Sequence, residues 1–244
     1  MTKPLQWIEY DLLKQFPHIR AKTYLRHGGA SQNQFASFNL SKSVGDDNYH
    51  VQENIEIIKE DLHADDVVFA KQVHGSQIIE VNHDNSNILE GDLLFTKEKN
   101  KALIITHADC QAAIFYDDIN KMGMVVHAGW KGLVKNVYQK AIDYLQAKGS
   151  EKENIIVCIS PSLGSDHSEF KNYEKELPSS FFSYKKEGYL FDLKKIAKDQ
   201  LLSGGILEKN IEISTICTYD NEQDFYSYRR DKSTGRHGTV LMMV

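Results

Sequence analysis

Three residues of the types that bind zinc stand beside short apolar runs of the chain. His74 lies between two such runs, Cys110 follows the run that ends near residue 105, and His127 ends another. Zinc prefers nitrogen and sulfur donors at ~2.0–2.3 Å, and three protein ligands leave a fourth position for water. The metal lowers the pKa of that water to around 7. These residue types predict a catalytic zinc centre, with copper as the alternative because thiolate and imidazole also bind copper.

The same residues allow chemistry without a metal. Cys110 could be a nucleophile and His127 its base, with Asp109 or another acid orienting the imidazole. His107 is a further candidate ligand or base, although a hydrogen-bonded core histidine is the preferred interpretation. No Cys-x-x-Cys or His-Glu-x-x-His pair places two ligands on one element. A buried thiol near two turn histidines would give the same spacing, so the pattern alone leaves these alternatives open.

The elements around these residues follow from apolar periodicity. Runs rich in β-branched residues predict strands over 67–69, 77–81, 102–106, 112–116, 123–126, 155–159 and 211–216. Helical spacing predicts one helix through 51–62 after cap residues at 46–48, another from near Lys131 through 134–145 closed by Gly149, and a third capped by Asp192. Strands and helices mix without strict βαβ alternation, which predicts an α+β fold with a mixed sheet.

The whole chain sets further bounds. Its 244 residues contain no repeat, low-complexity tract or linker-like stretch, which predicts a single domain over 1–244. The net charge of −5 argues against a nucleic-acid or anionic membrane partner, and no apolar run is long enough to cross a bilayer. Three widely spaced cysteines and no apolar signal-peptide core at the start predict a cytoplasmic protein. None of this predicts an oligomeric state.

An ordered series of motifs runs along nearly the whole chain. It comprises RHGG at 26–29, ASFNL at 36–40, QVHG at 72–75, ADC at 108–110, HAGWKG at 127–132, FYSYRRD at 225–231 and TGR at 234–236. This series resembles the signature of the YfiH family, also called the multicopper polyphenol oxidase or laccase-domain family. The resemblance implies a layered α/β sandwich with mixed sheets, similar to a bacterial cysteine toxin deamidase.

The resemblance also implies an activity. It predicts zinc bound by His74, Cys110 and His127, phosphorolysis of adenosine, inosine or methylthioadenosine, and deamination of adenosine. The partners would then be small molecules, a purine nucleoside and phosphate. The deamidase likeness keeps a Cys–His hydrolase acting on an amide or a cell-wall precursor as an alternative. The family's older name keeps copper-dependent polyphenol oxidation as another.

Four polar residues in or near the motifs are predicted to bind substrate: Arg26, Asn39, Lys131 and Arg230. Arg229 and Arg230 are adjacent and would point to opposite sides of an extended segment, so one of them is expected to enter the site, where arginine binds phosphate bidentately. Arg230 is the one preferred. Lys131 stands at a predicted helix start, where free N–H groups favour an anion. Asp109 is predicted to be catalytic together with Cys110 and His127.

The chain departs from the family pattern at several places. His107 stands where the family usually has threonine, and Ser160 stands where glycine usually precedes proline. Asp92 takes the place of an acid that the family carries one position earlier. These changes leave the three predicted ligands intact, and they leave the details of the substrate pocket open.

Overall fold

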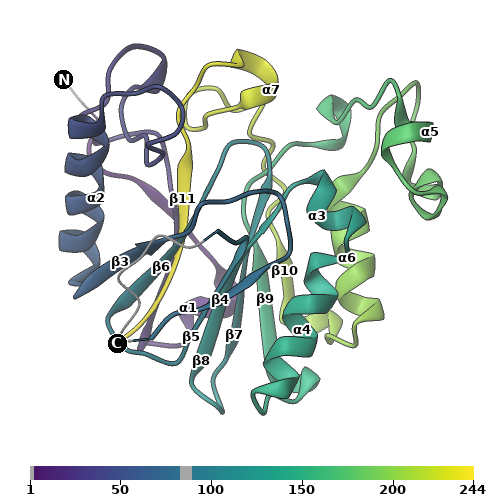
Figure 1. The fold of residues 1–244 in the computed structure, drawn as a ribbon, viewed down its shortest axis with the longest axis horizontal. Coiled ribbons are helices and arrows are strands. Elements are labelled where there is room, and N and C mark those ends of the chain that lie inside the picture. Colours follow the sequence, from purple (N-terminus) through teal and green to yellow (C-terminus); the bar gives the residue numbers. More distant parts are fainter. Residues whose placement is uncertain (1–2, 83–89) are drawn as a thin grey trace.

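The computed structural model describes residues 3–82 and 90–244, which form two mixed β-sheets packed face to face with helices outside (Figure 1). The five-stranded sheet has the order β1-β2-β11-β6-β3, and the six-stranded sheet has the order β10-β9-β7-β8-β5-β4. Each sheet contains parallel and antiparallel pairs. The strands are β1 Trp7–Glu9, β2 Ile19–Tyr24, β3 Asp66–Phe69, β4 Ile78–Glu80, β5 Leu93–Thr96, β6 Lys101–His107, β7 Gln111–Asp117, β8 Met122–Ala128, β9 Ile155–Ile159, β10 Ile211–Ile213 and β11 His237–Met243. The predicted α+β class with mixed sheets is confirmed.

Helices cover the outer faces of both sheets. These are α2 Asn48–Leu62 on the five-stranded sheet and α3 Trp130–Val134, α4 Val137–Ala147 and α6 Leu193–Ser203 on the six-stranded sheet. The other helices are α1 Asp11–Lys14, whose Leu13 packs between the sheets, α5 Tyr173–Glu176 and α7 Tyr228–Asp231. Short 3-10 turns occupy Asn33–Phe35, Lys152–Asn154, Ser165–His167, Ser179–Tyr184 and Glu208–Asn210. Figure 1 shows α2 beside the sheet of β11, β6 and β3, and α4 with α6 beside the sheet of β7, β8 and β9.

Three layers of apolar side chains hold this sandwich together. One fills the space between the two sheets and includes the fully buried Leu103, Ile105, Ile114 and Val125. A second lies between α2 and the five-stranded sheet, and a third lies between the six-stranded sheet and α3, α4 and α6. The central strands are therefore packed on both faces, which fixes the positions of the residues at their ends.

Strand register brings distant residues to one end of the six-stranded sheet. Leu93 of β5 pairs with Val126 of β8, and Ala112 of β7 pairs with His127. Asp92 and Cys110 directly precede β5 and β7, so both stand beside His127 at this end.

Two predicted helix caps are present. Asp47 accepts a hydrogen bond from the backbone N–H of Tyr49 and begins α2, and Asp192 begins α6. The single helix predicted from near Lys131 to residue 145 is wrong, because the chain breaks it into α3 and α4. Asn136 adopts a φ of 50° there and its side chain caps α4, a conformation and a role that asparagine tolerates well.

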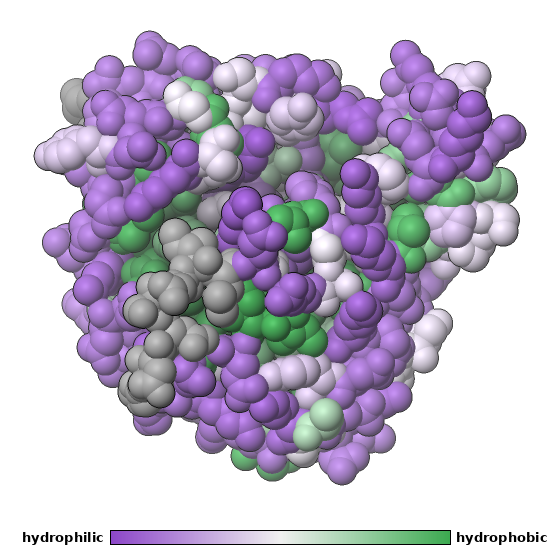
Figure 2. Space-filling view, viewed as in Figure 1, coloured by the Kyte–Doolittle hydropathy of each residue, from purple (hydrophilic) through white to green (hydrophobic). Residues whose placement is uncertain are grey.

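Within the described part of the chain, no helix is both long and apolar enough to span a bilayer. The face drawn in Figure 2 is mainly hydrophilic, with apolar residues showing in limited areas.

Candidate metal centre

The structure brings the three predicted metal ligands together. One potential ligand atom from each of His74, Cys110 and His127 lies within 4.8 Å of the others, and Cys110 Sγ is 4.0 Å from His74 Nε2. The two imidazole rings meet edge to face with their centroids 4.8 Å apart. A zinc ion with bonds of ~2.0–2.3 Å would hold its donors roughly 3.3–3.8 Å apart. Small side-chain movements would therefore suffice to close the cluster around an ion.

The backbone near the cluster adopts conformations that side chains usually avoid. His74 has a φ of 56° and Asp109, next to Cys110, has a φ of 88°. Such left-handed residues concentrate at functional sites, where the surrounding fold holds them. Gly129 lies against the cluster, since a Cβ there would come 2.9 Å from His74 Cδ2 and 3.0 Å from Cys110 Sγ. The absence of a side chain at residue 129 therefore leaves space for the ligands.

A buried carboxylate orients one of the ligands. Asp92 is fully buried, and its Oδ1 lies 2.7 Å from His127 Nδ1. This contact favours the tautomer in which Nδ1 carries the proton, leaving the Nε2 lone pair for a metal. The same carboxylate accepts hydrogen bonds from the backbone N–H groups of Val73, His74 and Gly75. Asp92 therefore fixes both the His127 imidazole and the loop that carries His74.

This arrangement answers which acid orients His127. The sequence prediction named Asp109 or another acid, and the structure has Asp92 in that contact. The carboxylate of Asp109 instead accepts hydrogen bonds from Thr218 Oγ1 at 2.7 Å and from the backbone N–H of Arg229 at 2.6 Å. Asp109 thus ties the loop before Cys110 to two segments near the C-terminus.

The cluster changes the protonation of its members. Burial alone would raise the pKa of the Cys110 thiol, but the charges and hydrogen bonds of His127 and His74 lower it to about 6. Burial opposes protonation of His127, but Cys110 and Asp92 raise its pKa to about 9. Without a metal, the pair is therefore a thiolate beside an imidazolium at neutral pH. A thiolate is also the form that binds zinc or copper, and the donor set suits either ion.

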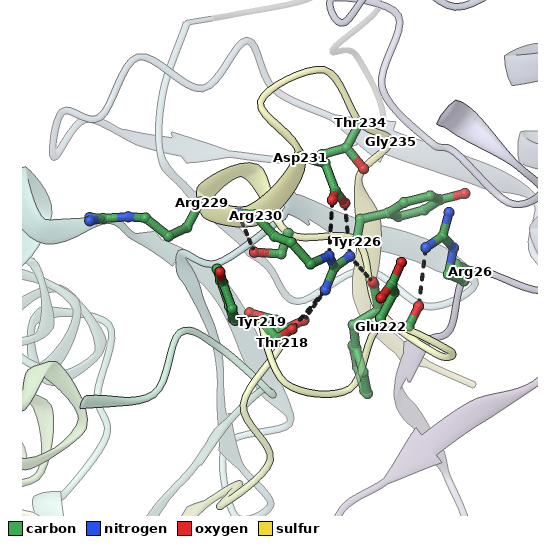
Figure 3. A network of polar contacts seen from close by, with 12 residues as sticks. Arg26, Thr218, Tyr219, Glu222, Tyr226, Arg229, Arg230, Asp231, Thr234 and Gly235 are labelled. Atoms are coloured by element: carbon green, nitrogen blue, oxygen red, sulfur yellow. Dashed lines mark hydrogen bonds and ion pairs between the residues drawn. The ribbon is translucent and has the colours of Figure 1, made fainter. Parts of the chain in front are cut away.

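Arg230 is bonded within the loop that carries it. Its guanidinium donates to the carbonyl oxygens of Thr218, Tyr219 and Phe225 and pairs with Asp231 (Figure 3). This network uses all the guanidinium donors to hold the loop, and substrate binding by Arg230 stays a prediction. Figure 3 also shows the side chain of Arg229 pointing away from this network.

Asn39 is likewise used within the fold. It is fully buried, and its amide donates to Ser41 and Asp46 while its Oδ1 accepts from the backbone N–H groups of Ser41 and Arg236. These bonds occupy both donor hydrogens and both acceptor positions of the amide. Asn39 therefore holds this loop, and its substrate contact stays a prediction.

Arg26 and Lys131 are the other two residues predicted to bind substrate. Arg26 donates to the carbonyl oxygens of Ala36 and Glu222 and lies 4.6 Å from the ring centroid of Tyr226. Lys131 is exposed in the first turn of α3, with its ammonium 5.4 Å from the Trp130 ring. The motif places Lys131 four residues after His127, and its substrate contact stays a prediction.

One cation that sequence analysis did not select lies near the cluster. Burial lowers the pKa of Arg236, and the negative charges of Cys110 and Asp109 oppose that shift. Its Nη1 donates to the carbonyl oxygens of Thr234 and Gly235. No hydrogen bond joins its Nε or Nη2 to the rest of the described chain. The TGR motif contained the available signal, but nothing in it ranked Arg236 above the other arginines.

His107 is a core residue, as preferred from the sequence. It is 2% exposed, and its Nε2 lies 2.8 Å from Thr239 Oγ1. Burial lowers its pKa to about 3, so it stays neutral.

The fold agrees with comparisons to known proteins. A family model described as multi-copper polyphenol oxidoreductase laccase matches residues 20–244, so the chain belongs to this family. The resemblance to the YfiH family is thereby confirmed.

Relatives with known names share most of the chain. A purine nucleoside phosphorylase of Haemophilus influenzae is 30% identical over 235 residues, covering 92% of this chain and 94% of the relative. The Bacillus subtilis purine nucleoside phosphorylase YlmD is 30% identical over 239 residues, covering 90% and 85%. The crystal structure of the Bacillus licheniformis hypothetical protein YfiH has a TM-score of 0.89 at 27% identity, covering 99% and 97%. These relatives support an enzyme acting on a small molecule.

Proposed function

We propose that the protein is a zinc-dependent purine nucleoside phosphorylase that cleaves adenosine, inosine or methylthioadenosine and also deaminates adenosine. One observation carries the proposal: donor atoms of His74, Cys110 and His127 lie within 4.8 Å of one another, and Asp92 orients His127. The names of the relatives support the substrate class. When bound, zinc would polarise the substrate or acidify a water molecule.

In this proposal two cations, Arg236 and Lys131, bind phosphate. Arg236 is preferred because its partly buried guanidinium lies in the field of Cys110 and Asp109 and keeps Nε and Nη2 unbonded to other described residues. Guanidinium forks match phosphate oxygens bidentately. Lys131 would add a second, exposed positive charge from the start of α3.

Proton transfer during deamination falls to Asp109. Its carboxylate belongs to the residue before Cys110, and its two hydrogen bonds leave further lone pairs for a substrate. Asp92 is less suited to this task, because it is fully buried and already accepts four hydrogen bonds. Asp92 would act by positioning His127 and the His74 loop.

The test combines metal analysis with product analysis. Zinc-loaded protein is incubated with adenosine, inosine or methylthioadenosine, with and without phosphate, and the products are separated by chromatography. We expect free base to form only with phosphate, and inosine to form from adenosine without it. Cys110→Ala should lose both activities, and Cys158→Ala, which removes a buried thiol from β9, should keep them. If zinc-loaded wild-type protein forms none of these products, the proposal is wrong.

A Cys–His hydrolase is the second candidate, and the titration of the pair favours it. The pKa of Cys110 is lowered to about 6 and that of His127 is raised to about 9, which would give a reactive thiolate without any metal. Metal-free protein that hydrolyses an amide and carries a covalent adduct on Cys110 would support this candidate against the zinc proposal.

Copper-dependent phenol oxidation is the activity that the family's description names. Besides the His74 cluster, the described residues hold one other group of three potential ligands, so a site for the several coppers of a laccase has little support. Oxidation that requires added copper and is lost in Cys110→Ala would favour this activity.

A further inference from the structure

A second group of potential metal ligands lies outside the proposed active centre. His167 ends the 3-10 turn Ser165–His167, and Cys217 and Asp220 belong to the segment after β10. One ligand atom from each of these residues lies within 4.8 Å of the others. Imidazole nitrogen, thiolate sulfur and carboxylate oxygen are the three donor types that zinc uses in proteins.

The imidazole of His167 is held in place. Its ring stacks on Tyr219 with the centroids 3.8 Å apart and the planes 15° apart. Its Nε2 lies 2.7 Å from Asp220 Oδ1, and the Asp220 side chain is 62% exposed. A shared ion would separate these two atoms to roughly 3.3 Å. The carboxylate can make that movement by a small rotation, because most of its surface faces solvent.

The sulfur of Cys217 lies against the backbone of the segment that carries His167. The backbone N–H of Gly164 donates to Cys217 Sγ at 3.2 Å. A Cβ at residue 164 would come 3.0 Å from this sulfur, so glycine allows the close approach. An N–H donor stabilises negative charge on sulfur, in a metal site as in a free thiolate.

The cluster opens to solvent. Cys217 and Asp220 both line an open hollow of about 600 Å³, together with Thr215, Ile216, Asn221, Glu222 and Gln223. We propose that His167, Cys217 and Asp220 form a second zinc site, with its remaining coordination position facing this hollow. The charges of one thiolate and one carboxylate balance those of a divalent ion, and water or an anionic ligand can fill the open position.

An ion at this site would add a further link between two segments that already contact each other through a backbone bridge, side-chain hydrogen bonds and a ring stack. His167 belongs to the segment after β9, and the turn of 217–220 follows β10. Thr218 within that turn donates to Asp109 Oδ1, and Arg230 binds the carbonyl oxygens of Thr218 and Tyr219. Zinc binding should therefore stabilise the turn that contacts the residue before Cys110.

The experiment separates the two sites. The double variant His74→Ala/Cys110→Ala lacks two ligands of the first centre and is titrated with Co²⁺, whose absorption reports bonding to a thiolate. We expect one ion per chain and a higher Tm with metal. Adding Cys217→Ser should weaken binding by at least ~100-fold, and adding Asp220→Asn by ~10-fold. Adding Asp166→Asn, which removes an 80% exposed carboxylate beside His167, should change nothing.

Two results would overturn the proposal. One is a folded double variant that binds no Co²⁺, and the other is binding that Cys217→Ser leaves unchanged. If the double variant does not fold, the metal content of wild-type protein is compared with that of the single variant Cys217→Ser. Two ions per chain in wild type and one in Cys217→Ser support the site, and the same number of ions in both proteins contradicts it. This outcome does not depend on the proposed enzymatic activity.

Discussion

Replacing Asp92 with asparagine removes the negative charge behind the proposed metal centre with little change in size. The carboxylate accepts from His127 Nδ1 at 2.7 Å and from the backbone N–H groups of Val73, His74 and Gly75 at 3.2, 3.0 and 2.7 Å. An asparagine amide has one oxygen and one NH₂ group, so its NH₂ must face at least one of these donors. The His127 ring and the His74 loop should both lose their fixed positions.

The size of the effect follows from these contacts. A hydrogen bond to a charged group contributes about 1.5–3 kcal/mol, and a buried donor without a partner costs about 1–3 kcal/mol. We therefore expect Asp92→Asn to lower the free energy of unfolding by about 3 kcal/mol. Loss of a group that orients a metal ligand weakens metal binding by about 10–100-fold. That loss corresponds to about 1.4–2.7 kcal/mol of binding free energy.

The assay measures zinc affinity by competition with a chromophoric chelator and stability by urea unfolding of the same samples. Asp117→Asn is the matched control, because Asp117 is also fully buried and also accepts four hydrogen bonds. It lies at the end of β7 that is far from Cys110. Asp117→Asn should lose stability and keep its zinc affinity. An Asp92→Asn protein that binds zinc within about twofold of wild type would refute the reasoning.

Three further predictions concern other residues of the site. In metal-free protein, alkylation of Cys110 should rise through about pH 6, because its pKa is lowered by the two imidazoles; a midpoint near the ordinary thiol value of about 8.5, measured by mass spectrometry, would contradict this. Gly129→Ala should abolish zinc binding by metal analysis, because its Cβ would meet two ligands, and Gly132→Ala, whose Cβ has no contact closer than 3.5 Å, should retain it. Arg230→Gln should lower the free energy of unfolding in urea by about 3 kcal/mol and leave the KM for phosphate unchanged, whereas Arg236→Gln should raise that KM about tenfold. A raised KM in Arg230→Gln and an unchanged KM in Arg236→Gln would instead support Arg230 as the phosphate ligand.

The central strands could be predicted from sequence because burial on both faces makes them continuous apolar runs. The predicted runs 112–116 and 123–126 lie within β7 Gln111–Asp117 and β8 Met122–Ala128. β2 was not predicted, because Lys22 interrupts its apolar pattern. In the structure Lys22 is 7% exposed, pairs with Asp61 at 2.6 Å and lies 4.0 Å from the Trp7 ring. These partners are distant in sequence, and no local pattern reveals them.

The site could also be predicted only in part, because some of its contacts join residues that are far apart in the sequence. Residue type and family motif selected His74, Cys110 and His127, and the fold brings them together. The role of Asp92 depends on the register of β5 against β8, which the sequence does not specify.

The expectation that one of Arg229 and Arg230 enters the site assumed an extended segment. Residues Tyr228–Asp231 instead form α7, where neighbouring side chains point about 100° apart. The rule of opposite sides therefore did not apply. The single domain over 1–244 stays a prediction.

Anomalous diffraction at the zinc absorption edge, from crystals of zinc-loaded protein, tests the central claim most directly. The account predicts a peak bonded to a nitrogen of His74, Sγ of Cys110 and Nε2 of His127, with Nδ1 of His127 still on Asp92. A map with no peak among these three side chains, in protein active on nucleosides, would contradict it.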